Sequence, residues 1–276
     1  MKSYILGNKS ESERLNFQSR QRNYSPQTEI SAQELALFED AKVLDAGCGT
    51  GLFSRYIADL NAGKNIEIFA IDASEQRITE AKNDSENSNY KNITFSKQDL
   101  RNLDFPDNSL DIVVCRFVYE HIKDICQEVS NELFRVLKPA GKLFIIDSDG
   151  ILFNMDSEDE QLDIYLDEIK SSEINFEGFI CRKIPRYLQR AGFHQQNIKI
   201  SPKPMLFFEE EDRNYEKTLW QMRFNQIKPV FTPILGEEGY SDFINRFISE
   251  LMNPQNFLYY NKFVFEAIKK DERSSH

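Results

Sequence analysis

Apolar runs alternate with segments of helical spacing over residues 42–149, and this alternation constrains the fold more than any other feature of the chain. The runs at residues 110–117 and 142–149 are almost continuously apolar, as strands are when both faces of a parallel sheet are buried. The predicted strands are residues 42–47, 66–72, 92–99, 110–117 and 142–149, and the predicted helices are residues 52–60, a segment ending near Lys82, and residues 120–137. Strands that alternate with helices in this way predict a doubly wound α/β sheet.

The alternation continues less regularly outside this region. The further predicted elements are an N-terminal surface helix at residues 9–22, an acidic and partly helical segment at 151–176, a helix at 183–193, a sixth strand at 194–200, two helices within 213–252, and an aromatic last strand at 256–270. The two helices of residues 213–252 are expected to be separated by a proline-containing turn, KPVFTPILGEEG, at residues 228–239.

The composition limits the partners that this chain is expected to bind. A net charge of −11 opposes nucleic-acid binding, which depends on Lys and Arg neutralising phosphates. No apolar stretch approaches the roughly 20 residues of a membrane helix, and the first residues turn polar too early for a signal peptide. The four cysteines have no zinc-binding or disulfide spacing. We therefore expect a cytoplasmic protein with reduced thiols, no metal and no membrane contact.

Three of the 11 glycines lie within five positions of the stretch VLDAGCGTG, residues 43–51. Gly47, Gly49 and Gly51 follow a predicted strand that ends at Asp45, and a helix follows them, which is a typical anion-binding corner. A Walker loop is excluded because no lysine follows Gly51. A dinucleotide site normally has the spacing GxGxxG, whereas this chain has GxGxG. A dinucleotide and S-adenosylmethionine therefore both remain candidate ligands of this turn. The carboxylate of Asp45 suits the second, because S-adenosylmethionine has a cationic ammonium in its methionine part.

Two further carboxylates lie at the ends of the next predicted strands. Asp72 ends the second strand, where a carboxylate can accept both hydroxyl hydrogens of a ribose. Asp99 ends the third strand, where it can accept from an adenine amino group. Either residue alone is equally compatible with a helix N-cap or a turn, but three acids at three successive strand ends favour an adenosine-containing ligand.

At this point the chain resembles the class I, Rossmann-like S-adenosylmethionine-dependent methyltransferases of the small-molecule type. The motifs VLDAGCGTG, AIDAS, QDLRNLDFPDNSLDIVV and VLKPAGKLFIID occur in the order and spacing of that family over about residues 40–150. Ala140 departs from the family's second glycine in a loop outside the binding motifs. The resemblance implies a mostly parallel seven-stranded sheet with an antiparallel last strand, covered by a helical cap.

The resemblance also implies roles for individual residues. Asp45 and the three glycines would hold the methionine part of the cofactor. Asp72, with Ala73 beside it, would bind the ribose, and Asp99 with the Leu100 backbone would bind the adenine. No catalytic residue is assigned, because the sulfonium is already a good leaving group and alignment supplies much of the rate.

Other candidates come from the ends of the fourth and fifth strands and from the N-terminal helix. Arg116, His121 and Asp149 are candidates to face the substrate, and Arg116 is also a candidate to hold a carboxylate of the cofactor. Arg14 and Gln18 are four residues apart on one helix face and are expected to face the cofactor. For each of these side chains a surface ion pair, a turn or a packing role is the alternative.

Four segments are therefore expected. Residues 1–30 form a helical segment over the site, residues 31–200 the cofactor-binding core, residues 201–255 a helical cap insertion, and residues 256–270 the last strand of the core sheet. The expected function is methyl transfer to nitrogen or oxygen of a small-molecule acceptor by in-line displacement. The alternatives are a catalytically idle cofactor-binding or partner-binding protein and a protein methyltransferase.

Overall fold

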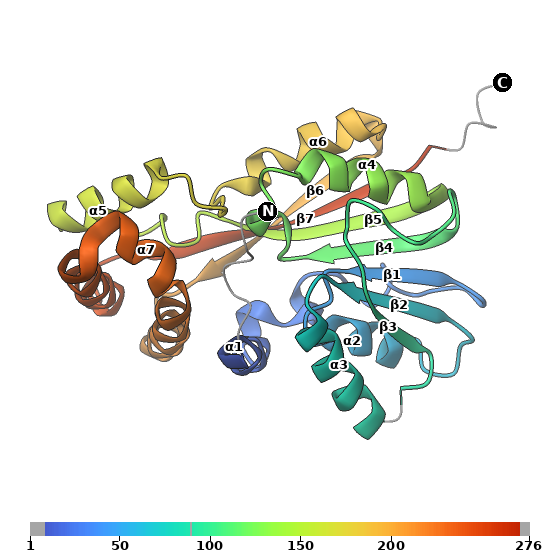
Figure 1. Cartoon of the computed structure of the whole chain (residues 1–276), viewed down its shortest axis with the longest axis horizontal. Helices are drawn as coiled ribbons and strands as arrows, with labels where there is room; N and C mark the ends of the chain where they lie inside the picture. The colour runs from blue at the N-terminus through green and yellow to red at the C-terminus, as the bar shows by residue number, and fades with distance from the viewer. Residues whose placement is uncertain (1–8, 89, 271–276) are drawn as a thin grey trace.

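The computed structural model describes residues 9–88 and 90–270, which form a single sheet with helices on both faces (Figure 1). The strands are β1 (Lys42–Ala46), β2 (Glu67–Asp72), β3 (Ile93–Lys97), β4 (Leu110–Arg116), β5 (Leu137–Asp149), β6 (Ile198–Leu206) and β7 (Tyr259–Ile268). Their order across the sheet is β3-β2-β1-β4-β5-β7-β6. The five strands from β3 to β5 are parallel, and β7 is antiparallel to both of its neighbours. The predicted fold class is confirmed.

Two apolar cores separate the sheet from its helices. On one face, α4 (Cys126–Val136) and α6 (Ile184–Ala191) pack on the sheet through a cluster that includes Leu133 and Leu188. On the other face, α2 (Leu52–Leu60) and α3 (Glu75–Asn87) pack through Ile57 and Ile78. The central strands are buried from both sides, which explains their continuous apolar sequence.

A third core lies beyond the end of the sheet where the parallel strands finish (Figure 1). It joins α5 (Glu160–Ser171) to the long helix α7 (Glu210–Met252), and its centre is the aromatic group Trp220, Phe224, Phe243 and Phe247. The rings of this group meet at centroid distances of 5.0–6.0 Å. The helix α1 (Lys9–Ser19) packs against α7, where Phe17 stacks on Tyr215 at 4.4 Å.

The structure corrects several predicted boundaries. The break predicted at residues 228–239 between two helices is present, but it lies at Gly236 (φ 76°, ψ 166°), and the helix continues through Pro229 and Pro233. The helix predicted at 120–137 is a 3₁₀ turn, Tyr119–His121, followed by α4 from Cys126. Residues 201–206, expected to begin the cap, are the second half of β6.

Within the described residues, no helix is both long and apolar enough to cross a membrane.

Candidate functional site

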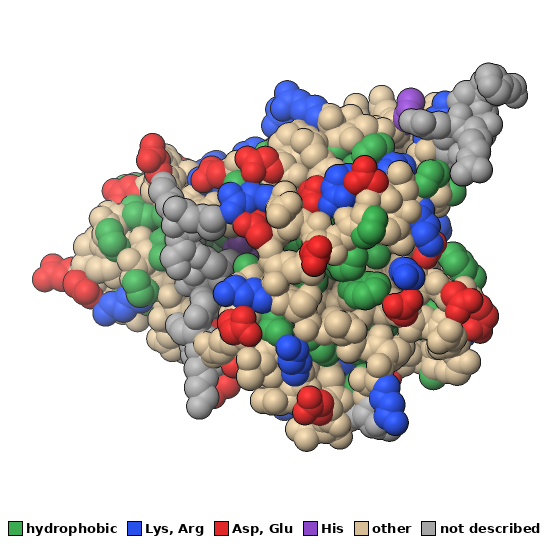
Figure 2. Space-filling model, turned by 45° about the vertical axis from the view of Figure 1, so that its right-hand side comes forward, with side chains coloured by type: hydrophobic (Ala, Val, Ile, Leu, Met, Phe, Trp, Pro, Cys, Tyr) green, Lys and Arg blue, Asp and Glu red, His purple; other side chains and the backbone are tan. Residues whose placement is uncertain are grey.

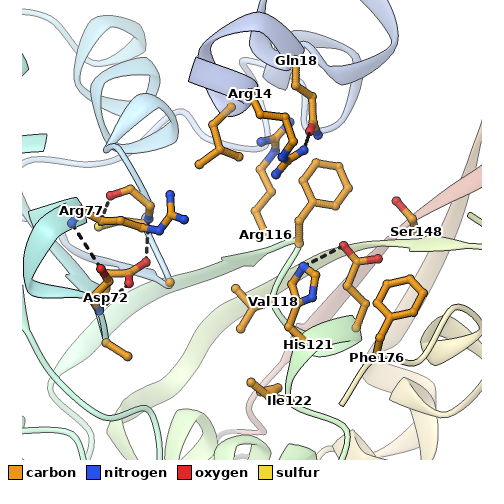
Figure 3. A pocket seen from close by; sticks show the side chains of 18 of the residues that line it. Arg14, Gln18, Asp72, Arg77, Arg116, Val118, His121, Ile122, Ser148 and Phe176 are labelled. Carbon is orange, nitrogen blue, oxygen red and sulfur yellow. Dashed lines mark hydrogen bonds and ion pairs between the residues drawn. The ribbon is translucent and has the colours of Figure 1, made fainter. Parts of the chain in front are cut away.

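A cavity of about 820 Å³ lies at the carboxyl ends of the parallel strands, between the sheet and helices α1 and α7. Figure 3 shows three groups of side chains around it: Arg14 and Gln18 from α1, Asp72 and Arg77 from β2 and α3, and His121, Phe176 and Ser148. The candidate residues that line the cavity are Arg14, Gln18, Asp45, Gly47, Gly49, Asp72, Ala73, Asp99, Leu100, Arg116 and His121. The structure therefore brings most of the candidate residues together around one cavity, whose lining does not include Gly51 or Asp149.

The glycine turn brings its backbone close to the cavity. Gly47, Gly49 and Gly51 have φ values of 83°, 55° and 75°, in the left-handed region that favours glycine. The N–H groups of Gly47 and Cys48 both donate to the Ile71 carbonyl at 2.8 Å, which fixes the turn to the end of β2. A Cβ atom at Gly47 would lie 2.5 Å from a methyl carbon of Val118. Glycine at position 47 therefore lets the turn pack directly against Val118, which lines the same cavity.

Asp72 connects the end of β2 to this turn. Its carboxylate accepts hydrogen bonds from the Gly49 N–H at 3.0 Å and from the Ser74 N–H at 2.8 Å, and it lines the cavity (Figure 3). These bonds fix the orientation of the carboxylate before any ligand arrives.

Asp45 lies deeper in the same wall. It is 1 % exposed and accepts a hydrogen bond from the Ser54 hydroxyl at 2.5 Å. Burial raises the pKa of its carboxyl group to about 6, and the bond from Ser54 opposes this rise. The ionised carboxylate suits a cationic ammonium. The positive charge would compensate for the solvation by water that the carboxylate loses on burial.

If Asp45 binds the ammonium group of the cofactor, we expect cofactor binding to depend on pH. Because the folded-state pKa lies near 6, the carboxyl group is protonated below that pH and loses its attraction for the ammonium group of the ligand. We expect the affinity for S-adenosylhomocysteine to rise about tenfold between about pH 5 and pH 7. Calorimetric titrations across this range measure the effect. Asp45→Asn should flatten the profile, and an unchanged profile in that variant would exclude Asp45 as the titrating group.

Asp99 is less buried than the other two acids. Its carboxylate forms an ion pair with Arg101 at 2.5 Å, and hydrogen bonds from Arg101 lower the pKa of Asp99. The side chain of Asp99 is about half exposed and lines the cavity beside Leu100. It lies two residues beyond the end of β3 rather than at its last residue.

The helix α1 covers one side of the cavity. Arg14 donates from Nε to Glu11 at 2.7 Å and from Nη1 to the amide oxygen of Gln18. Glu11 is fully buried and also lies 3.8 Å from Arg77 of α3. The expectation that Arg14 and Gln18 share a face directed at the site agrees with their position in the cavity wall.

Arg116 was a candidate to hold a carboxylate of the cofactor, and in this structure it binds the carboxylate of Glu29. Its guanidinium binds Glu29 through two hydrogen bonds of 2.6 and 2.8 Å and donates to the Tyr24 carbonyl. Glu29 also accepts from the buried ammonium of Lys262 at 2.7 Å. Arg116 lines the cavity, but this network holds residues 24–29 against the sheet.

Asp149 does not face the cavity, so that expectation is wrong. The residue is 6 % exposed, and its carboxylate pairs with Arg182 at 3.1 Å. Arg182 lies more than thirty residues further along the chain, and only folding brings the two side chains together.

Several residues of the cavity wall were not predicted as site residues. They are Arg77, Ser148, Ile151, Leu152, Asn175, Phe176, Arg223, Ile227 and Phe231. Arg77 carried a usable signal, because it lies within the first turns of the helix after Asp72. The cap residues gave no comparable signal, since an aromatic side chain in a helix packs in a core far more often than it lines a site.

Comparisons with known proteins agree with this geometry. Residues 37–213 match the family model described as a methyltransferase domain. The chain is 31% identical over 110 residues to the methyltransferase YcgJ of Bacillus subtilis, and 36% identical over 102 residues to the ubiquinone biosynthesis O-methyltransferase of Coxiella burnetii. These matches cover 38% and 37% of this chain, and 40% and 41% of those relatives.

A solved structure shares the fold over almost the whole chain. The phosphoethanolamine N-methyltransferase 2 of Haemonchus contortus, in complex with phosphomonomethylethanolamine and S-adenosylhomocysteine, has a TM-score of 0.55 and 19% identity. The match covers 97% of this chain and 56% of that one.

The fold is that of a class I methyltransferase, and S-adenosylmethionine is the cofactor. The chain belongs to the methyltransferase domain family. Its residues fit the cofactor, because a glycine turn with positive φ angles and three acids near the ends of successive strands line one cavity.

Proposed function

We propose that this chain transfers a methyl group from S-adenosylmethionine to a small-molecule acceptor. The observation that carries the proposal is the cavity itself, which continues from the three acids to a wall of apolar side chains supplied by α7 and by the residues after β5. Trp220, Ile227 and Phe231 belong to this wall together with Ile151 and Leu152. A pocket of this size with apolar walls and a few polar groups is typical of a small-molecule site.

The residues of this chain have separable tasks in the proposed reaction. When bound, the cofactor supplies a methyl group on a sulfonium, which is a good leaving group. Asp45, Asp72 and Asp99 would hold its ammonium, ribose and adenine. The helices α1 and α7 would exclude water and align the acceptor, so positioning would supply much of the rate.

The surface gives no support to a nucleic-acid substrate. Figure 2 shows a face on which acidic and basic side chains are interspersed, without a continuous basic patch. The net charge of −11 points the same way, because nucleic-acid binding depends on basic side chains. The phosphoethanolamine methyltransferase of similar fold is named for a small acceptor.

We also propose that different segments of the chain have different functions. Residues 1–30 would cover the site, residues 31–200 with the last strand would bind the cofactor, and the insertion that contains α7 would act as a cap. A cap of this kind selects acceptors that fit inside it. We place the reaction in the cytoplasm.

A screen with isotope-labelled cofactor tests the function. The protein is incubated with fractionated metabolites, and mass spectrometry identifies compounds that gain a labelled methyl group. We expect the label in a low-molecular-mass compound. Label that accumulates in the protein or nucleic-acid fraction would replace the small-molecule proposal with a macromolecular substrate.

Asp72→Ala tests the assignment of the ribose. Removing the carboxylate should weaken S-adenosylhomocysteine binding by about 1–3 kcal/mol, because both hydroxyl groups lose their acceptor. Asp72 also accepts hydrogen bonds from the N–H groups of Gly49 and Ser74, so the substitution can weaken binding by disturbing the turn. The affinity of the variant is therefore measured for two ligands, one with and one without the ribose hydroxyl group. Calorimetry with S-adenosylhomocysteine and with its deoxyribose analogue separates the effects. An equal loss for both ligands would mean that Asp72 only supports the turn.

A further inference from the structure

The carboxylate of Glu120 has an unsatisfied oxygen in the cavity wall. Glu120 lies in the 3₁₀ turn after β4 and is 6 % exposed. Its Oε1 lies 3.3 Å from Nε2 of His121, whereas its Oε2 is buried without a hydrogen-bond partner. A buried acceptor without a partner costs free energy, so the oxygen is a site where a ligand donor would be stabilising.

A second unsatisfied acceptor belongs to the same end of the cavity. The amide oxygen of Asn175 is buried without a partner, and Asn175 lines the cavity. The Glu177 N–H donates to the Glu120 carbonyl at 2.9 Å, which attaches the segment of Asn175 to the 3₁₀ turn. The rings of His121 and Phe176 lie 6.0 Å apart, and Figure 3 shows them beside each other. Two different elements therefore supply cavity-lining residues that each have an unpaired acceptor oxygen.

The charges at this end favour a cationic or donor-rich ligand. Asp147 is fully buried beneath the turn and accepts from the Glu120 N–H at 3.3 Å. Burial and the neighbouring Glu120 raise the pKa of Asp147 well above its usual range. Asp124 also lines the cavity, and Lys183 is engaged by Glu177.

The rest of the wall is apolar. Ile151 and Leu152 follow β5, and Trp220, Ile227 and Phe231 face the same space from α7. Burying an apolar body against these side chains is favourable in proportion to the area removed from water. The wall therefore combines acceptor oxygens with an apolar surface.

We propose that the methyl acceptor is an amine with an apolar body. Its N–H groups donate to Oε2 of Glu120 and to the Asn175 amide oxygen, and its apolar part lies against α7. This inference rests on the proposed function and names its substrate class. Glu120 is then the residue that distinguishes an amine from an alcohol or an acid of the same shape.

Three probes of one shape test the inference by binding alone. Calorimetry on the full chain saturated with S-adenosylhomocysteine compares phenethylamine, phenethyl alcohol and hydrocinnamate. We expect the amine to bind at least about tenfold more tightly than the other two, because a hydrogen bond to a charged group contributes more than a neutral one. Glu120→Gln should remove most of this preference, while S-adenosylhomocysteine affinity stays unchanged.

Two further variants complete the design. Asn175→Leu should weaken amine binding by about fivefold to tenfold through loss of one acceptor. Glu128→Gln makes the same chemical change at an exposed position of α4 outside the cavity wall and should leave all three affinities unchanged. Equal binding of the probes, no binding of the amine, or a preference that persists in Glu120→Gln would overturn the inference. Failure to bind S-adenosylhomocysteine would instead contradict the proposed function.

Discussion

Glu29→Ala should lower the free energy of unfolding by about 3–5 kcal/mol, since it removes the shared partner of the buried Lys262 and the half-buried Arg116. Glu29 is 2 % exposed and binds Arg116 at 2.6 Å and Lys262 at 2.7 Å. Lys262 is 1 % exposed, and its burial lowers the pKa of the ammonium group, which Glu29 opposes. Without the carboxylate, both cations lose their anionic partner in a region that is poorly accessible to water. Urea denaturation at neutral pH measures the loss.

Two comparisons make this result specific. Glu237 pairs with Lys228 at 3.0 Å on the surface, with side chains 70% and 52% exposed, so Glu237→Ala should change stability by less than about 1 kcal/mol. Adding Lys262→Met to Glu29→Ala should recover part of the loss, because one unpaired cation is then absent. Additive effects of the two substitutions would show that Glu29 and Lys262 do not stabilise each other.

Gly51→Ala should destabilise the protein by about 2–5 kcal/mol through two separate costs. The residue has a φ of 75°, and its added Cβ would lie 2.7 and 2.9 Å from ring carbons of Phe95. Phe95 is buried in the core beneath α2 and α3, so it cannot swing into solvent. Because Gly51 begins α2 beside the glycine turn, we also expect weaker S-adenosylhomocysteine binding.

Gly63→Ala separates the two costs. Gly63 has a φ of 88°, but no atom lies within 4 Å of an added Cβ, so this variant has the backbone strain without the collision. It should lose only about 1–2 kcal/mol and retain cofactor affinity. Thermal and urea unfolding of both variants measure the difference. Equal losses would show that Phe95 moves aside freely.

The sheet was predictable because its sequence signal is local. Strands such as β4 and β5 are buried on both faces, and their apolar runs occur at the spacing that crossover helices require. The acids at the strand ends were predictable for the same reason, since parallel strands deliver their carboxyl ends to one edge. Asp45, Asp72 and Asp99 thus lie in one cavity wall, although their contacts with a cofactor stay a prediction.

The cap was less predictable, because tertiary packing decided it. A proline removes a backbone donor and crowds the preceding turn, so Pro229 and Pro233 predict a break. In the structure the helix passes both prolines and breaks further along the predicted turn, at Gly236, with Phe224 and Phe231 in the third core before the break and Phe243 after it. The ion pair between Asp149 and Arg182 was equally unpredictable. The distance between the two side chains in the folded chain cannot be inferred from their separation in the sequence.

The position of β7 determines the order in which the chain can complete its sheet. Within the described residues, β6 pairs with β7 alone, although β6 precedes it by more than fifty residues. During synthesis β6 therefore cannot pair with β7 until residue 268 has left the ribosome, whereas β1 to β5 can pair earlier. Such distant pairing slows folding and leaves the edge of β5 open in the meantime. The half of the sheet that holds the three acids is thus able to form before β6 and β7 complete the other edge.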